Sequence, residues 1–360
     1  MCIYYGDTHG LTYKKREHIF PAGLGGKTML PKGYVSDQAN ELFSPLELNL
    51  MHSSIISLIR AMEGPGKRGS LKPQNASTSE ICTYQSDDGT IELGYIKTGK
   101  PYTISQIHID LTKTQFRFIC PSDDTQPAEA LEEFKKYLLN FSGKFVSIHS
   151  KELQPSTIII GVWKNKFYIA YREFLPDTQY LSDQIKLFCQ KAAIKGVSSH
   201  ETHGEFKLNM IESPDSYRVY AKIAYNVLAN FGGKQFVLDS RFDRIRNWIL
   251  GGNDCKFEHL PQKFSPLPNL VFPPSAHFCF FTCNNGKLIA VVCLYSMWYH
   301  TFEFCDWNLL PDEYPYPGIL GFVCDWKNGK EYTMRDWILK LVENSDSKEP
   351  DKFRKDKTSC

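Results

Sequence analysis

The chain has 360 residues, in which 42 lysines and arginines almost balance 40 aspartates and glutamates, so its formal net charge is +2. This balance excludes binding to nucleic acid through overall positive charge, and any such affinity must come from a local basic patch. The sequence shows neither a secretory signal pattern nor an apolar run of about eighteen residues, so we expect a cytoplasmic protein that does not span a membrane.

The first residues predict a β-hairpin. Residues 2–5 and 11–13 are rich in side chains that favour strands, and the stretch 6–10 between them contains two glycines and an aspartate, which are typical of turns. A charged run follows the second predicted strand and leads to His18. We therefore expect His18 at the end of the second strand of this hairpin.

A loop and a helix are expected next. Residues 21–33 contain many Gly and Pro residues, which argues against a regular element there. Ser36 or Asp37 offers an N-cap for a short helix through Phe43. Asn40 lies on this predicted helix. The expected order is thus strand, loop and helix, with one polar candidate residue on each side of the loop.

The residue types in this order suit the hydrolysis of a phosphodiester bond. The imidazole of His18 titrates closest to neutral pH, so it can act as the general base that takes a proton from water. Glu17 and Asn40 carry hard oxygen ligands of the kind that Mg²⁺ or Mn²⁺ binds, and such a cation keeps several waters and takes further ligands from the substrate phosphate.

These residues resemble the HNH, or ββα-metal, endonucleases, in the branch that reads Glu-His-Ile-x-Pro, Leu-Gly-Gly and then Asn on the next helix. The resemblance is strongest over residues 2–60, and it implies His18 as the base and Glu17 and Asn40 as ligands of one Mg²⁺ or Mn²⁺. The middle Asn of the family signature has no counterpart between His18 and Gln38. The matching segments are Arg16-Glu17-His18-Ile19-Phe20-Pro21, Gly23-Leu24-Gly25-Gly26 and Ser36-Asp37-Gln38-Ala39-Asn40.

A structural zinc is a further point on which the chain departs from this family. Many members carry two Cys-x-x-Cys pairs around the hairpin and helix, but the four matching positions here are Cys2, Tyr5, Ser36 and Ala39. A structural zinc needs four ligands in a closed tetrahedron, which one remaining thiolate cannot supply. We therefore expect no structural zinc.

A local basic patch surrounds the predicted site. Its lysines and arginine are placed to bind the nucleic-acid backbone. Residues 23–28, Gly-Leu-Gly-Gly-Lys-Thr, also look like the end of a phosphate-binding loop, but Pro21 stands where that motif requires another glycine, so we interpret Lys27 as part of the patch instead. The patch consists of Lys14, Lys15, Arg16, Lys27 and Lys32.

The residues after the predicted helix form a second helix and then a linker. Ser44-Pro45-Leu46-Glu47 reads as a capping box with proline at the first helical position, so a helix is expected from there to about Met62. Residues 63–80 are rich in Gly, Pro and Ser, and we expect a linker or loop whose Lys67, Arg68 and Lys72 are either simply solvated or free to meet phosphate.

The remainder of the chain predicts an α+β class. We expect residues 1–62 to be the nuclease module, 63–80 the linker, 81–345 an α+β domain with a mainly antiparallel sheet, and 346–360 a charged tail. The predicted strands are 106–111, 115–120, 144–148, 157–163, 166–171, 278–282 and 287–294, the last two joined by a hairpin turn at Asn284-Asn285-Gly286. The predicted helices are 128–141, 183–194, 215–230 and 241–250, with Gly232-Gly233 ending the third.

Part of the C-terminal half is also similar to the region that follows the nuclease in this family. The likeness rests on Arg218, on Lys222-Ile223-Ala224-Tyr225-Asn226 and on an aromatic hairpin through Trp298, and it assigns no catalytic residue; Arg218 and Lys222 read equally as exposed helix cations. The sequence has eleven cysteines and no Cys-x-x-Cys pair, so we interpret them as thiols. His277, Cys279 and Cys283 come nearest to a metal cluster, but we expect buried thiols there.

The sequence thus predicts a metal-dependent endonuclease that acts on DNA rather than RNA, with a larger domain for recognition or sensing. Restriction or anti-phage defence is the analogy that this layout invites. Two alternatives stay open at this point. One is a nucleic-acid-binding protein whose nuclease site has decayed. The other is a ligand-sensing effector whose nuclease is activated through the C-terminal domain by a ligand, a partner or a second copy of the chain.

Overall fold

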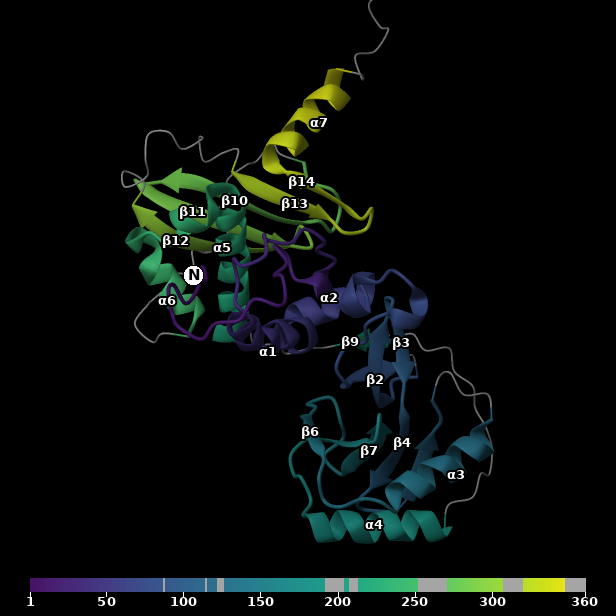
Figure 1. The fold of residues 1–360 in the computed structure, drawn as a ribbon. Coiled ribbons are helices and arrows are strands. Elements are labelled where there is room, and N and C mark those ends of the chain that lie inside the picture. The colour runs from purple at the N-terminus through teal and green to yellow at the C-terminus, as the bar shows by residue number, and fades with distance from the viewer. Residues whose placement is uncertain are drawn as a thin grey trace, which may run out of the picture. The chain divides into compact units, whose positions relative to one another are not determined.

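The computed structural model describes residues 1–86, 88–113, 115–121, 126–191, 204–206, 213–251, 271–306 and 320–346. These residues form helices and mainly antiparallel sheets, which confirms the predicted α+β class. The contacts divide the chain into two compact units, each with its own sheets (Figure 1). Unit 1 comprises Met1–Ile59, Pro65–Asn75 and Glu212–Cys360, and unit 2 comprises Arg60–Gly64 and Ala76–Ile211.

This division differs from the predicted one, in which residues 1–62 and 81–345 are separate domains. The N-terminal segment and the C-terminal part of the chain share one hydrophobic core, in which Phe43 and Leu50 are buried together with Tyr225 and Phe304. A short segment with one long helix cannot cover its own apolar side chains, so it shares a core with residues far along the chain. The predicted linker is likewise split, because residues 65–75 belong to unit 1.

The long helix α5 (Pro214–Val237) is the centre of unit 1. It contacts α1 (Asp37–Ser53) and four of the five strands of a sheet ordered β12-β11-β10-β13-β14 (Figure 1). The predicted stop at Gly232-Gly233 is a kink within α5, where Gly233 has φ 79°. The strands are β10 (His277–Asn284), β11 (Lys287–Leu294), β12 (Trp298–Asp306), β13 (Gly321–Asp325) and β14 (Lys330–Thr333). The other elements are α6 (Asp243–Ile249), α7 (Met334–Asp346) and the 3-10 turns η1 (Ala22–Leu24), η2 (Lys67–Gly69), η3 (Pro73–Asn75) and η4 (Ser240–Phe242). Helix α2 (Ile55–Glu63) begins in unit 1, and its residues 60–63 belong to unit 2.

Both faces of this sheet are buried, which follows from the alternation of side chains along a strand. On β10, Cys279 and Phe281 lie in the core that contains α5, whereas Phe278 and Phe280 lie in a second cluster with Trp337 of α7. The predicted hairpin between β10 and β11 is confirmed, and Asn285 at its tip has φ 51°. The charged tail predicted from residue 346 lies, beyond Asp346, outside the described residues.

The predicted N-terminal hairpin is wrong. Residue Cys2 pairs only with Gly6 in an isolated bridge, and the antiparallel pairing at the site joins His18 to Met29. The second arm therefore comes from the Gly- and Pro-rich stretch that was expected to be irregular. Two glycines allow this return: Gly25 has φ 92°, and a Cβ atom on Gly26 would lie 2.0 Å from the carbonyl oxygen of Phe20.

The predicted boundary between two helices at Ser44 is also wrong. Helix α1 begins after the N-cap Ser36 and continues through Pro45 to Ser53. The break falls at Ser54, whose hydroxyl donates to Leu50 O at 2.6 Å and accepts from Ile56 N at 3.1 Å. Within the described part of the chain, no single helix is long and apolar enough to cross a membrane, and residues 37–53 and 55–69 meet that test only as a bent pair.

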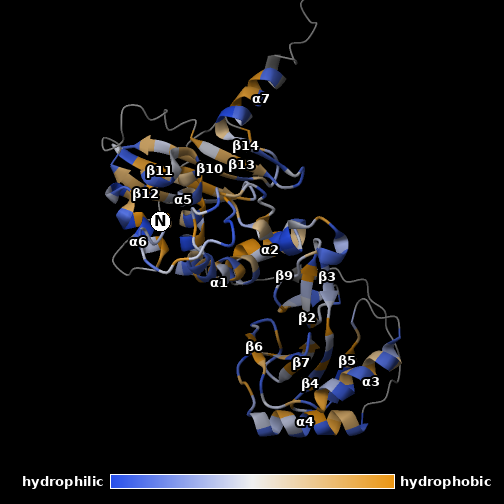
Figure 2. Cartoon of the chain, in the orientation of Figure 1, coloured by the Kyte–Doolittle hydropathy of each residue, from blue (hydrophilic) through white to orange (hydrophobic). Residues whose placement is uncertain are grey.

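A single large sheet was expected over residues 81–345, but its strands form three sheets, two of which are in unit 2. One has the order β3-β2-β1-β9, and the other, β5-β4-β7-β8-β6, is antiparallel except between β6 and β8. Figure 2 shows hydrophobic and hydrophilic residues alternating along α3 and α4, whose Phe134 and Phe188 are buried in one cluster with Ile160 of β7. The bounds are β1 (Cys82–Ser86), β2 (Ile91–Lys97), β3 (Lys100–Thr103), β4 (Ser105–Asp110), β5 (Gln115–Ile119), α3 (Pro127–Leu138), β6 (Val146–His149), β7 (Thr157–Trp163), β8 (Lys166–Tyr171), α4 (Thr178–Lys191) and β9 (Gly204–Phe206).

The shared core predicts that residues 1–75 do not fold alone. Expressed as a fragment, they should show no cooperative thermal transition, because their buried side chains lose α5 and the sheet as partners. Circular dichroism on heating measures this, and adding residues 212–360 as a second fragment should restore a transition. A sharp transition of the isolated fragment would contradict the shared core.

Asp37 predicts a specific pH dependence of stability. Its carboxylate accepts from Thr12 Oγ1 at 2.6 Å and from the backbone amides of Lys14 and Lys15 at 3.0 and 2.9 Å, and these bonds lower its pKa to about 2. Because the folded pKa lies below that of an unfolded aspartate, about 4, this stabilisation is complete above pH ~4 and is lost as the pH falls towards 2.

Asp37→Asn should therefore melt at a lower temperature than wild type at pH 7, and the difference should close between about pH 4 and pH 2. Asp7→Asn is the control, since Asp7 is an exposed aspartate of the same segment. Thermal melts across this range measure both variants. A difference between Asp37→Asn and wild type that stays constant down to pH 2 would rule out this role of the carboxylate.

Candidate active site

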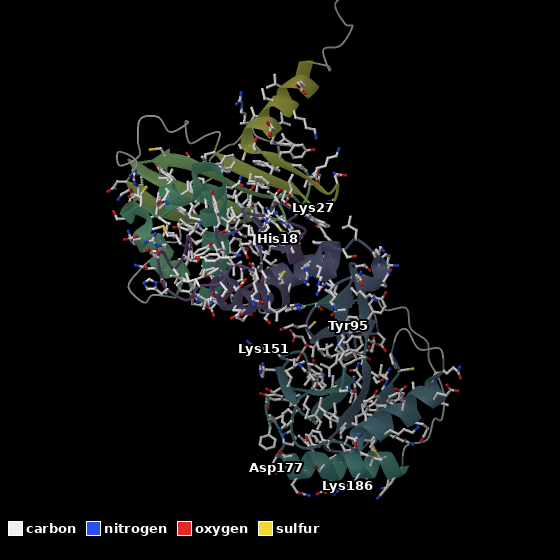
Figure 3. The ribbon with its side chains drawn as sticks, in the orientation of Figure 1. His18, Lys27, Tyr95, Lys151, Asp177 and Lys186 are labelled. Carbon is white, nitrogen blue, oxygen red and sulfur yellow. The ribbon has the colours of Figure 1, made fainter. Side chains whose placement is uncertain are left out.

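Glu17 and His18 lie on the short antiparallel pair that precedes α1. Backbone bonds hold the pair on both sides of His18: Ile19 N donates to Thr28 O at 2.9 Å, and Leu30 N donates to Glu17 O at 2.8 Å. Figure 3 labels His18 in unit 1. The His18 side chain is partly buried, and the Glu17 side chain is only 13% exposed. The structure thus fixes the backbone of both predicted site residues.

The carboxylate of Glu17 binds a buried lysine from α5. The Lys222 side chain has no exposed surface, and its ammonium donates to Glu17 Oε1 and, at 2.5 Å, to Glu47 Oε1 on α1. The interpretation of Lys222 as an exposed helix cation is therefore wrong. A sequence signal for its burial did exist: in the stretch 219–229 every residue except Lys222 and Asn226 is apolar or aromatic, and the structure buries all eleven.

A second residue of α5 holds the backbone of His18. Asn226, one turn after Lys222, is fully buried and donates from Nδ2 to His18 O at 3.0 Å. The hydroxyl of Tyr4 donates to Asn226 Oδ1 at 2.7 Å, which fixes the orientation of the amide. Adjacent turns of one helix therefore contact adjacent residues of the predicted site, one through a side chain and one through a carbonyl.

Burial and nearby charges set the protonation of these groups. Burial raises the pKa of Glu17, as does the charge of Glu47, while the ammonium of Lys222 acts in the opposite direction. Burial also lowers the pKa of His18, and Lys222 adds to this while Glu47 opposes it. His18 is consequently a neutral imidazole at neutral pH, which is the form that can accept a proton.

Asn40 lies on the first part of α1, and its amide is unusual. Both Asn40 Oδ1 and Nδ2 are buried, and neither has a hydrogen-bond partner among the described residues. A buried polar group without a partner costs about 1–3 kcal/mol, so such groups call for a specific explanation. Asn40 and Glu47 are two helical turns apart and lie on the same face of α1, so the amide shares the face that Lys222 contacts.

These residues fit a hard divalent cation by their donor chemistry. Glu17 and Asn40 would be its protein ligands, and the unpartnered Asn40 amide oxygen is the observation in favour of this set. Among the described residues, no three His, Cys, Asp or Glu side chains are placed to hold a metal ion together. The fit is therefore to a cation such as Mg²⁺ that takes few protein ligands, one of them an amide.

The loop between the two arms binds a carboxylate of the chain itself. Glu331 on β14 accepts from the backbone amides of Lys27 and Thr28 at 2.9 and 2.7 Å and from the Thr28 hydroxyl at 2.5 Å. The Lys27 ammonium, labelled in Figure 3, donates to Gly329 O at 3.0 Å. The resemblance of this loop to a phosphate-binding loop thus has a structural counterpart in an anion-binding turn, but its anion is Glu331.

A buried histidine ties the same loop to the sheet. His277 Nε2 lies 3.0 Å from Leu24 O, and its Nδ1 accepts from Tyr295 N at 3.0 Å, so Nε2 is the donor. Burial lowers the pKa of His277 to about 3 and keeps the ring neutral. Because backbone groups occupy both ring nitrogens, His277 is a structural residue; of its expected buried neighbours, Cys279 is buried and Cys283 is exposed.

The predicted basic patch is on the surface. All five of its residues, Lys14, Lys15, Arg16, Lys27 and Lys32, are exposed. The Arg16 guanidinium also donates to the carbonyls of Met29 and Leu30, both at 3.0 Å, and thereby supports the second arm. Of the four positions matched to zinc ligands, two lie together, since Ser36 N donates to Cys2 Sγ at 3.3 Å.

Comparisons with known proteins add no assignment to this site. The chain matches no protein-family model, no curated protein and no solved structure. The functional interpretation therefore depends on the residues and their contacts.

Proposed function

We propose that the protein is a metal-dependent endonuclease of the HNH, or ββα-metal, type that hydrolyses phosphodiester bonds in DNA. The observation that carries the proposal is Asn40, whose buried amide lacks a partner on the helix that follows the Glu17-His18 segment. A ligand role for Asn40 would supply the missing partner of its Oδ1 atom. The neutral state of His18 and its fixed backbone support the role of base.

In this proposal, His18 takes a proton from a water molecule as the water oxygen bonds to phosphorus. The bond from phosphorus to the leaving sugar oxygen breaks, and that oxygen takes up a proton from solvent. A bound Mg²⁺ or Mn²⁺, held by Glu17 and Asn40, would stabilise the charge that develops on the phosphate and the leaving oxygen. The exposed cations of the basic patch would bind flanking phosphates.

The second candidate function is binding of nucleic acid without cleavage. One observation favours it: Glu17 is hydrogen bonded to Lys222 and Glu47 shares that lysine, so the carboxylate already has a cationic partner. A site that had lost its metal could retain such an ion pair. The two candidates differ in whether a divalent cation produces cleavage.

Purified protein is expected to nick plasmid DNA in millimolar Mg²⁺ or Mn²⁺ and to lose this activity in chelator, because two protein ligands and a base cannot stabilise the phosphate charge without the cation. Agarose gels measure the nicking, with single-stranded DNA and RNA as further substrates. Cleavage of RNA alone would change the substrate of the proposal, and cleavage of no substrate with either metal would favour the second candidate.

Substitutions should separate the base from the ligand. His18→Ala should lower the cleavage rate about 10²- to 10⁴-fold at every metal concentration, because it removes proton abstraction. Asn40→Ala should weaken metal binding, so its rate should recover in part as Mg²⁺ or Mn²⁺ is raised. Cleavage rates measured against metal concentration test both variants.

Two matched variants control for the substitutions themselves. His9→Ala replaces an exposed histidine of the N-terminal turn, and Asn49→Ala replaces an exposed asparagine of the same helix α1. Both should cleave as wild type does. Undiminished activity of His18→Ala would refute the site, and rescue of His18→Ala by metal beside an unrescued Asn40→Ala would reverse the two roles.

A further inference from the structure

Lys222 carries a fully buried charge in unit 1. Its side chain is completely buried on a helix whose neighbouring residues are buried as well. An ammonium in such surroundings is tolerated only when it is paired and hydrogen bonded. Replacing Lys222 alone by an apolar residue would leave both carboxylates that it binds without a cation, so the group of three has to be explained as a whole.

Those carboxylates come from different elements and share the same ammonium. Glu17 lies on the short antiparallel pair that precedes α1, and Glu47 lies on α1. Each accepts a hydrogen bond from Lys222 through its Oε1 atom. Two carboxylates and one ammonium leave a net charge of −1. A single Glu17–Lys222 pair would be neutral, so Glu47 is what keeps this group of three attractive to a further cation.

The ring of Phe43, on α1, also contacts the Lys222 ammonium. The Lys222 ammonium lies 5.4 Å from the centre of that ring. Phe43 itself lies between Asn40 and Glu47 along α1. Because the ammonium donates to an oxygen of each glutamate, it occupies the position between them where a cation bridging both would lie. The second oxygen of Glu17, Oε2, accepts no hydrogen bond from the described residues.

We propose that Lys222 is a positioning residue that prevents Glu17 and Glu47 from chelating a divalent cation together, and thereby directs the cation to Glu17 and Asn40. This inference rests on the proposed function, because it concerns where the catalytic cation binds. Lys222 holds one oxygen of Glu17 and leaves the other for the cation. Asn226, one turn further along α5, fixes the carbonyl of His18 in the same way, so α5 aligns base and ligand together.

The test measures Mn²⁺ binding to the full-length protein without DNA, by calorimetry, beside cleavage at saturating Mn²⁺. In Lys222→Met the two glutamates lose their shared ammonium, so Mn²⁺ should bind at least about tenfold more tightly while cleavage falls at least about tenfold. In Lys222→Met/Glu47→Gln, which restores the net charge of −1, Mn²⁺ affinity should return towards that of wild type. Adding Asn40→Ala should weaken Mn²⁺ binding in wild type but not in Lys222→Met.

Two further variants keep the test decisive. Lys234→Met removes another lysine of α5, one that donates to the carbonyls of Met1 and Gly33, and it should change neither quantity. If Lys222→Met fails to fold, Glu47→Gln alone should weaken Mn²⁺ binding several-fold, since the group of three becomes neutral.

The outcomes separate this inference from the proposed function. Unchanged or weaker Mn²⁺ binding by a folded Lys222→Met, or unchanged binding by Glu47→Gln, would overturn the role of Lys222 while leaving the nuclease assignment intact. Wild-type protein that binds no Mn²⁺ would instead overturn the metal site itself, and the positioning role with it.

Discussion

The buried ion pairs of Lys222 are the constraint on which the rest of unit 1 depends. One ammonium joins the antiparallel pair that carries Glu17, helix α1 and helix α5, and α5 is far from the other two in the sequence. Removing a single partner of a buried ion pair commonly costs about 3–5 kcal/mol, because the other charge is left without compensation. These three elements are therefore coupled, and the position of Glu17 follows from the packing of α5.

The loop between His18 and Met29 is held by residues of the sheet in unit 1. Glu331 binds two backbone amides of the loop, and His277 binds the carbonyl of Leu24. Neither residue carries the proposed chemistry, yet both hold a Gly-rich segment in one geometry. Their hydrogen bonds offset the large conformational entropy that this segment loses when it is ordered. The C-terminal half of the chain thus serves as the scaffold of the N-terminal site, and the site requires both the N-terminal segment and this scaffold.

Such a scaffold has a chemical consequence for the proposed nuclease. A general base contributes most when its orientation is fixed before the substrate binds, and Asn226 with Tyr4 fixes the backbone of His18 from the protein interior. Burial lowers the pKa of His18, and the nearby ammonium acts in the same direction, so the imidazole is available as a base at neutral pH. One lysine therefore influences both the ligand and the base.

The sequence alone determined the α+β class and several local features: an N-cap at Ser36 or Asp37, the hairpin turn at Asn284-Asn285-Gly286, and the candidates Glu17, His18 and Asn40. These depend on residue type and short spacing, which turn and capping preferences encode directly. Only the tertiary structure decided that Met29 pairs with His18, that α1 continues through Pro45, and that Lys222 and Glu47 meet Glu17. Those outcomes depend on a core shared between residues some two hundred positions apart, and no local pattern specifies which distant side chains will share a buried charge.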